Sequence, residues 1–152
     1  MLTRLLAAST LILLGAALPR AAAFSGSRSE DETAVREALQ HYLNGHATGQ
    51  ADEFRQAMYP QGTMNFIRDG QFTQMSLADY IARAAAGTGK PAPDEAKRKR
   101  RIDFVDVAGN AAVGKIVLEN PDATITDYME LLKIDGKWQI VAKTFYADRK
   151  TS

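Results

Sequence analysis

The second half of the sequence is dominated by strands that follow one another without an intervening helix. The predicted strands span 101–107, 111–119, 124–134 and 137–145. Ala108-Gly109-Asn110 separates the first two strands, and Asp135-Gly136 separates the last two. Asp-Gly between alternating segments is a strong hairpin signal, because a two-residue turn of this kind needs positive φ angles. The pattern predicts a long antiparallel meander on which the other elements must pack.

The last of these strands has the alternation of a half-buried strand. Trp138, Ile140 and Ala142 alternate with Gln139, Val141 and Lys143. Successive side chains of a strand point to opposite faces of the sheet. We therefore expect the first three to face the core, with Trp138 as a core or dimer-contact residue.

The first half of the sequence begins with two predicted helices. The first opens at Asp31, the expected N-cap, and carries an apolar stripe at helical spacing as far as Leu43. Gly45 and Gly49 are expected to loosen its end. The second helix opens at Asp52 and stops before Pro60.

A hairpin and a third helix complete the first half. The segment 59–62, Tyr-Pro-Gln-Gly, has the composition of a turn, and strands 63–67 and 71–74 flank Asp69-Gly70. Ser76 is the expected cap of the third helix. Because strands and helices do not alternate regularly, we expect no parallel sheet. The fold class is α+β, with helices on the concave face of a curved antiparallel sheet and a hollow between the two layers.

Residues 1–23 have the pattern of an export signal. Arg4 precedes an apolar run from Leu5 to Leu18, and Ala21-Ala22-Ala23 offers the small residues of a cleavage site. The run is about 14 residues long, short of the ~20 that a spanning helix needs. We expect a periplasmic or secreted protein with no membrane attachment after cleavage. A retained anchor is the alternative. The expected organisation is a signal (1–23), a flexible lead (24–30) and one domain (31–148).

Charge and composition exclude several classes of partner. Cleavage would remove two of the 19 basic residues and leave 17 against 18 acidic ones, so nucleic acid is not an expected partner. The basic run 97–101 is followed by Asp103 and is interpreted as a solvated entry into an edge strand. With no Cys and only His41 and His46, neither a metal site nor a bound cofactor is expected.

Three segments resemble a known superfold. They are Ala38-Leu39-Gln40-His41-Tyr42-Leu43-Asn44-Gly45 in the first helix, Ala51-Asp52-Glu53-Phe54 at the start of the second helix, and the segment 126–141 around the Asp135-Gly136 turn. With the element order, they are similar to the nuclear transport factor 2-like superfold and, within it, to the SnoaL-like and "putative lumazine-binding" families. The resemblance covers about 31–147 and implies a cone-shaped domain. The superfold carries many unrelated functions, so the resemblance does not transfer one.

The resemblance implies a site at Tyr42 and Asp127. These positions match a tyrosine and a protonated aspartate that hydrogen-bond a developing oxyanion in ketosteroid isomerases of this superfold, a pair also known as a general example of pKa tuning. The position of the isomerase base falls on Phe66, which cannot transfer a proton. That departure disfavours isomerase chemistry of this kind. If the pair converges, Asp127 is expected to be buried beside the phenol.

The expected ligand pocket combines that pair with aromatic and soft side chains. Its candidate residues are Tyr42, Tyr59, Met64, Phe66, Tyr80 and Asp127. A second candidate constellation is His46 with Asp103 and Asp106, the type of His/Asp dyad that dehydratases use, although His46 is expected to be exposed where the first helix frays.

Three functions remain open. The first is an exported domain that binds a small, largely apolar molecule, which could carry a ring, without evident catalytic machinery. The second is a cofactor-independent isomerase, dehydratase or cyclase that uses Tyr42 and Asp127. The third is a homodimeric interaction domain, and a dimer is expected in any case because a curved open sheet leaves one apolar face uncovered.

Overall fold

The computed structural model describes residues 28–150. Three α-helices and six strands make up this part, with one short 3-10 helix before the third strand. In chain order they are α1 (Arg28–Thr48), α2 (Ala51–Ala57), β1 (Met58–Arg68), β2 (Gln71–Ser76), α3 (Leu77–Ala85), η1 (Glu95–Lys97), β3 (Lys99–Ala108), β4 (Ala111–Glu119), β5 (Ala123–Ile134) and β6 (Lys137–Arg149). The α+β class is confirmed. The expected signal at 1–23 lies outside the described residues.

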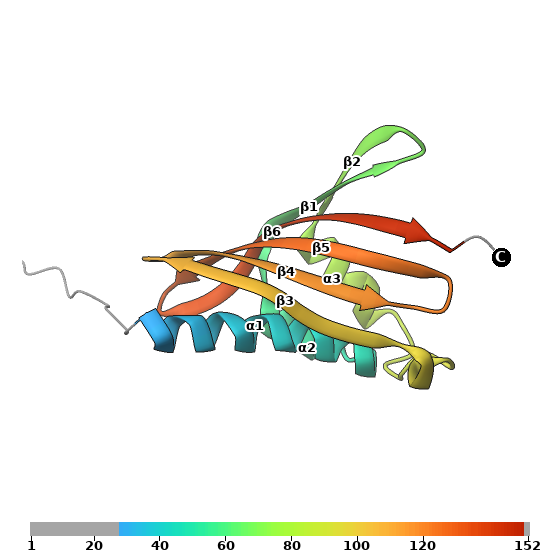
Figure 1. The fold of residues 1–152 in the computed structure, drawn as a ribbon, viewed down its shortest axis with the longest axis horizontal. Helices are drawn as coiled ribbons and strands as arrows, with labels where there is room; N and C mark the ends of the chain where they lie inside the picture. Colours follow the sequence, from blue (N-terminus) through green and yellow to red (C-terminus); the bar gives the residue numbers. More distant parts are fainter. Residues whose placement is uncertain (1–27, 151–152) are drawn as a thin grey trace, which may run out of the picture.

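The six strands form one mixed sheet in the order β2-β1-β6-β5-β4-β3. Figure 1 shows α1 and α2 along one face of this sheet. The hairpin of β1 and β2 projects beyond the other four strands. The expectation of a purely antiparallel sheet is wrong, because β1 pairs with β6 in parallel. The whole chain between them, including α3 and the meander, serves as the crossover that a parallel pair requires.

The predicted turns at Asp69-Gly70 and Asp135-Gly136 are confirmed. Asp69 and Gly70 have φ angles of 50° and 74°, and Asp135 and Gly136 have 49° and 81°, as a two-residue turn of this type needs. The Ser76 side chain accepts a hydrogen bond of 3.0 Å from the Asp79 backbone N–H, so it caps α3 as expected. The meander of β3 to β6 is also confirmed, and the basic run leads into the edge strand β3.

Two boundaries differ from the expectation. Helix α1 begins at Arg28, so Asp31 is not its N-cap; the Asp31 carboxylate instead accepts hydrogen bonds from Trp138 and Lys133. Strand β1 begins at Met58, so residues 59–62 are not a turn but part of a strand. The pairing of β1 with β6 shifts register between Met58 and Thr63, and Pro60 is tolerated in this irregular stretch because its missing N–H removes no regular ladder bond.

One hydrophobic core fills the space between helices and sheet. Helix α1 contributes a buried stripe that includes Val35, Leu39 and Leu43, and the sheet contributes Ile116, Met129 and other buried side chains. Trp138 is 3% exposed, so it is a core residue. Two polar side chains, Asp127 and Lys143, are buried among these apolar groups. The part of the core around Asp127 and Lys143 is therefore the candidate for a functional site.

Candidate functional site

A buried polar cluster joins α1 to β5 and β6, the two central strands of the sheet. The Tyr42 hydroxyl donates to Asp127 Oδ2 over 2.9 Å, and Lys143 Nζ donates to the Tyr42 oxygen over 2.6 Å. Lys143 Nζ also lies 3.0 Å from Asp127 Oδ1 as an ion-pair partner. Tyr42 and Asp127 have no exposed surface, and Lys143 is 5% exposed. A buried ion pair in an apolar core rarely adds stability over apolar residues of the same size, so this cluster is a candidate functional site.

Lys143 faces the core because β6 contains one extra residue. The pairing of β5 with β6 shifts between Glu130 and Leu131, whose partners are Ala142 and Ile140, so Val141 is the residue left over. Such a bulge reverses which later residues point inward. The expected inward position of Ala142 is therefore wrong, and Lys143 is buried in its place. Lys143 is two residues before Phe145, which is partly buried, so the two side chains lie on the same face of the strand. The apolar residue at position 145 is the only signal in the sequence for this reversal.

Three aromatic rings surround the Lys143 amine. Its Nζ lies 5.0 Å from the ring centroid of Tyr42, 5.8 Å from that of Tyr80 and 4.9 Å from that of Phe145. Contacts of this kind stabilise a cation when the site is dry. Burial nevertheless lowers the pKa of Lys143, while the neighbouring carboxylate of Asp127 acts in the opposite direction. Burial likewise raises the pKa of Tyr42 well above its usual value, so the phenol stays protonated.

A second polar pair, His46 and Tyr80, lies next to this cluster. His46 Nε2 and the Tyr80 oxygen are 3.0 Å apart. Burial, followed by the positive charges of Lys143, Arg100 and Arg98, lowers the pKa of His46 to about 3. Burial also raises the pKa of Tyr80. A neutral imidazole and a neutral phenol therefore share this hydrogen bond near pH 7.

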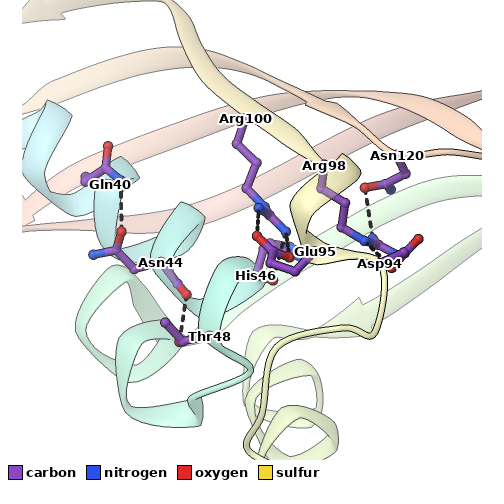
Figure 2. A network of polar contacts seen from close by, with 9 residues as sticks. All are labelled: Gln40, Asn44, His46, Thr48, Asp94, Glu95, Arg98, Arg100 and Asn120. Carbon is purple, nitrogen blue, oxygen red and sulfur yellow. Dashed lines mark hydrogen bonds and ion pairs between the residues drawn. The ribbon is translucent and has the colours of Figure 1, made fainter.

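The expectation that His46 is exposed at a frayed helix end is wrong. Helix α1 continues to Thr48, whose hydroxyl bonds the Asn44 carbonyl over 2.8 Å. Arg100 donates to the His46 backbone carbonyl over 3.0 Å and is itself held by Glu95. Figure 2 shows this arginine reaching from β3 to the end of α1, beside a second arginine, Arg98, that bonds Asp94 and Asn120. These contacts fix the end of α1 and the segment that follows α3.

The predicted dyad of His46 with Asp103 or Asp106 does not form. Asp103 pairs with Arg101 and Lys115, and Asp106 pairs with Arg28, so both carboxylates belong to surface ion pairs. Within residues 28–150, no group of three or more His, Cys, Asp or Glu side chains is arranged to hold a metal ion. The same residues contain no helix long and apolar enough to cross a membrane.

The His46–Tyr80 pair borders a hollow of about 550 Å³. It is an open hollow bordered by the C-terminal end of α1, by α2, β1, β2 and α3, and by the loop after α3. Its lining consists of Gly45, His46, Gly49, Phe54, Met64, Met75, Tyr80, Arg83, Ala84, Gly87, Thr88, Gly89, Lys90 and Ala92. The lining thus combines apolar and glycine surfaces with three neutral polar groups, His46, Tyr80 and Thr88, and two basic side chains, Arg83 and Lys90. It includes no carboxylate of the described residues.

The expected pocket residues fall into three places. Met64 and Tyr80 line the hollow. Tyr42 and Asp127 converge as the resemblance implied, but behind the hollow, where Lys143 donates to the Tyr42 oxygen and forms an ion pair with Asp127. Phe66 packs on Phe145, with ring centroids 5.0 Å apart. Tyr59 is half-buried on β1 and does not line the hollow. Sequence reasoning missed His46 as a lining residue and Lys143 altogether.

The fold and the sequence are similar to proteins of known structure or name. A family model described as "Putative lumazine-binding" matches residues 30–146. An NTF2-like protein of unknown function from Shewanella baltica is 24% identical, with a TM-score of 0.71 over 84% of this chain and 100% of its own. A second, from Methylobacillus flagellatus, is 26% identical, with a TM-score of 0.65 over 78% and 92%. A curated protein of Cladobotryum, "Aldolase FrzH", is 27% identical over 124 residues, which are 78% of this chain and 93% of that protein.

Proposed function

Since the chain belongs to the putative lumazine-binding family of NTF2-like domains, we propose that it binds a small organic acid with an apolar body in the hollow beside Tyr80. The charge of the lining carries this proposal. Arg83 and Lys90 line the hollow, form no ion pair with any residue of 28–150, and face no lining carboxylate. A mostly apolar hollow with two free cations favours a ligand that is apolar along its length and anionic at one end.

The inner wall supplies the second recognition element. Tyr80 and His46 are neutral and hydrogen-bonded to each other. They can therefore offer a hydrogen-bond donor or acceptor to a ligand without the cost of desolvating a charge. A carbonyl or hydroxyl oxygen is the group that fits there. The ligand that this geometry favours has an oxygen function near Tyr80 and an acidic group near Arg83 and Lys90.

Native mass spectrometry of the protein purified from its own host is the direct test. We expect a co-purifying small acid, and Arg83→Gln/Lys90→Gln should lose it. Lys137→Gln, which removes an exposed charge at the β5–β6 turn, is the matched control and should keep it. A neutral or basic co-purifying molecule, or an acid retained by the double variant, would contradict the proposal.

A second candidate function is catalysis of carbonyl chemistry without a metal. The buried Lys143, Tyr42 and Asp127 are separated from the hollow by Tyr80, and such a cluster can hold and move protons. The similarity to a protein named an aldolase, over nearly all of that protein, favours the same reading. The isomerase alternative lacks a base, because Phe66 stands where the resemblance places it. Detection of aldol or retro-aldol turnover, lost in Lys143→Arg, would establish this candidate.

We further propose that the protein is an exported homodimer. The outer face of the sheet carries exposed apolar side chains on neighbouring strands, and a groove of about 510 Å³ runs between Phe104, Val113 and Tyr128. Exposed apolar patches on a sheet favour self-association. For export, N-terminal sequencing of the cell-envelope form should begin within a residue or two of Phe24, and an intact Met1 on that form would contradict it.

A further inference from the structure

We infer that Lys143 is an imine-forming nucleophile, so that a small aldehyde or ketone that enters through the hollow becomes covalently attached to its Nζ. The inference rests on the second candidate function and names its reacting atom. It starts from three observations: the amine is buried, a phenol and a carboxylate lie within bonding distance of it, and the hollow begins one aromatic ring away.

The two partners of Lys143 supply the proton transfers that imine formation needs. Asp127 Oδ1 accepts no hydrogen bond of good geometry from the described residues, although Nζ lies 3.0 Å away. It is therefore placed to take a proton from the ammonium group and leave a free amine. Tyr42 lies 2.6 Å from the same nitrogen and can pass a proton to the carbonyl oxygen. One acid and one base thus flank the nucleophile.

The step balances without an oxidant or a cofactor. The Nζ lone pair forms the C–N bond while the carbonyl π electrons move to oxygen, which takes a proton from Tyr42. Asp127 returns the first proton, taken from the ammonium group, to Tyr42 through their hydrogen bond, and can then take the second proton from Nζ. This second proton leaves with the hydroxyl group as water to give the iminium ion. Transfer of a proton from the neighbouring carbon to the Asp127 carboxylate then gives an enamine, the nucleophile of an aldol reaction. Hydrolysis returns the free lysine.

The aromatic rings around Lys143 Nζ can accommodate the charged iminium ion as well as the unmodified lysine. Tyr42, Tyr80 and Phe145 lie 4.9 to 5.8 Å from the nitrogen. An iminium ion keeps the positive charge at this nitrogen and enlarges the apolar group attached to it, which suits an aromatic environment. Burial also lowers the pKa of Lys143, which increases the free-amine fraction at neutral pH.

Tyr80 controls access from the hollow. It lines the hollow on one side and lies 5.8 Å from Lys143 Nζ on the other. It is held by α3, a helix of nine residues, by its bond to His46 and by its contact with Phe54, whose ring centroid lies 5.3 Å from its own. Rotation of this side chain would connect the hollow with the amine. Replacement of Tyr80 by Ala removes one of the three rings near Lys143 but keeps Lys143, Tyr42 and Asp127 themselves, so it should speed access.

Acetylacetone tests the inference, because this small diketone condenses with a reactive lysine to give an enaminone that absorbs in the near ultraviolet. At pH 7 we expect one enaminone per chain, and peptide mapping of the wild-type protein should place it at position 143. Lys143→Arg should abolish this label, and Tyr80→Ala should form it severalfold faster. Lys137→Gln, which removes an exposed lysine at the β5–β6 turn, should not change it.

Labelling spread over surface lysines, or a single label at any other position, would overturn the inference. Because mapping of the wild-type chain gives the answer by itself, a failure of Lys143→Arg to fold would not obscure it. The proposed binding function is judged separately by the acidic ligand found in native mass spectrometry. An acid that binds beside an unlabelled Lys143 would leave binding intact and reject the nucleophile.

Discussion

Gly62 on β1 lies so close to Val141 on β6 that a methyl group added at Gly62 would be 2.4 Å from the Val141 carbonyl oxygen. The same methyl group would be 2.7 Å from Leu77 Cδ1, so neither the backbone nor the core leaves room for it. Gly62→Ala should therefore lower the free energy of unfolding by about 1–3 kcal/mol, the usual cost of overpacking. Urea denaturation checks this. Gln61→Ala, an exposed neighbour, should stay within about 0.5 kcal/mol of the wild type.

The buried pair of Lys143 and Asp127 should behave as a unit. Lys143→Met leaves Asp127 as a buried charge without a partner and should cost about 3–5 kcal/mol. Adding Asp127→Asn removes that charge and keeps an acceptor for the Tyr42 hydroxyl, so the double variant should recover most of the loss. Urea denaturation of the two variants measures the coupling. A double variant as unstable as the single one would show that the ion pair is not the source of the cost.

His46 should make the protein sensitive to acid. Its pKa is about 3 in the folded protein and ~6.5 in the unfolded chain, so below pH 6.5 the unfolded state binds a proton that the folded state does not. Stability should fall as the pH is lowered from 6.5 toward 3, by about 2 kcal/mol between pH 6.5 and 5 for this group. His46→Gln should lose this part of the pH dependence. An imidazole NMR titration of His46 with a midpoint near 6.5 would refute it.

The outer face of the sheet should hold two copies together. Tyr128 is 55% exposed beside Phe104 and Val113, so Tyr128→Asp places a charge in the proposed contact. Light scattering at micromolar concentration should report a dimer for the wild type and a monomer for this variant. Phe72→Asp, which changes a still more exposed aromatic residue on β2, should remain dimeric. A monomeric wild-type protein would contradict the proposal.

Local signals in the sequence were sufficient for most of the fold. The Asp69-Gly70 and Asp135-Gly136 turns, the Ser76 cap and the stripe on α1 each depend on neighbours a few residues away, and each is confirmed. The parallel pairing of β1 with β6 joins residues about 80 positions apart in the sequence, and no local pattern encodes it. Pro60 and Gly62 indicated a turn, whereas they mark an irregular stretch of a strand. Proline and glycine are found both in turns and in irregular segments of strands, so the sequence alone does not distinguish the two.

The candidate site was only partly accessible to sequence reasoning. Tyr42 and Asp127 were identified through a resemblance, and they do meet. Lys143 was placed on the wrong face, because alternation counted forward from Trp138 cannot detect an extra residue in mid-strand. His46 was placed in solvent because Gly45 and Gly49 suggested fraying. Gly45 is instead required by close packing, since a Cβ there would lie 2.7 Å from the Phe54 ring.

The extra residue in β6 lies between the turn and the buried lysine, so it could be lost without changing the face on which the amine lies. With Val141 deleted, Ala142 would follow Ile140 directly and still pair with Glu130, and Lys143 would still pair with the buried Met129 and face the core, while the turn at Asp135-Gly136 and the strand order could stay as they are. Two chains with this architecture could therefore differ by one residue in β6 and keep the same buried amine. Counting positions from the turn would misalign their lysines, so the residue that faces the lysine across β5 is the more informative character.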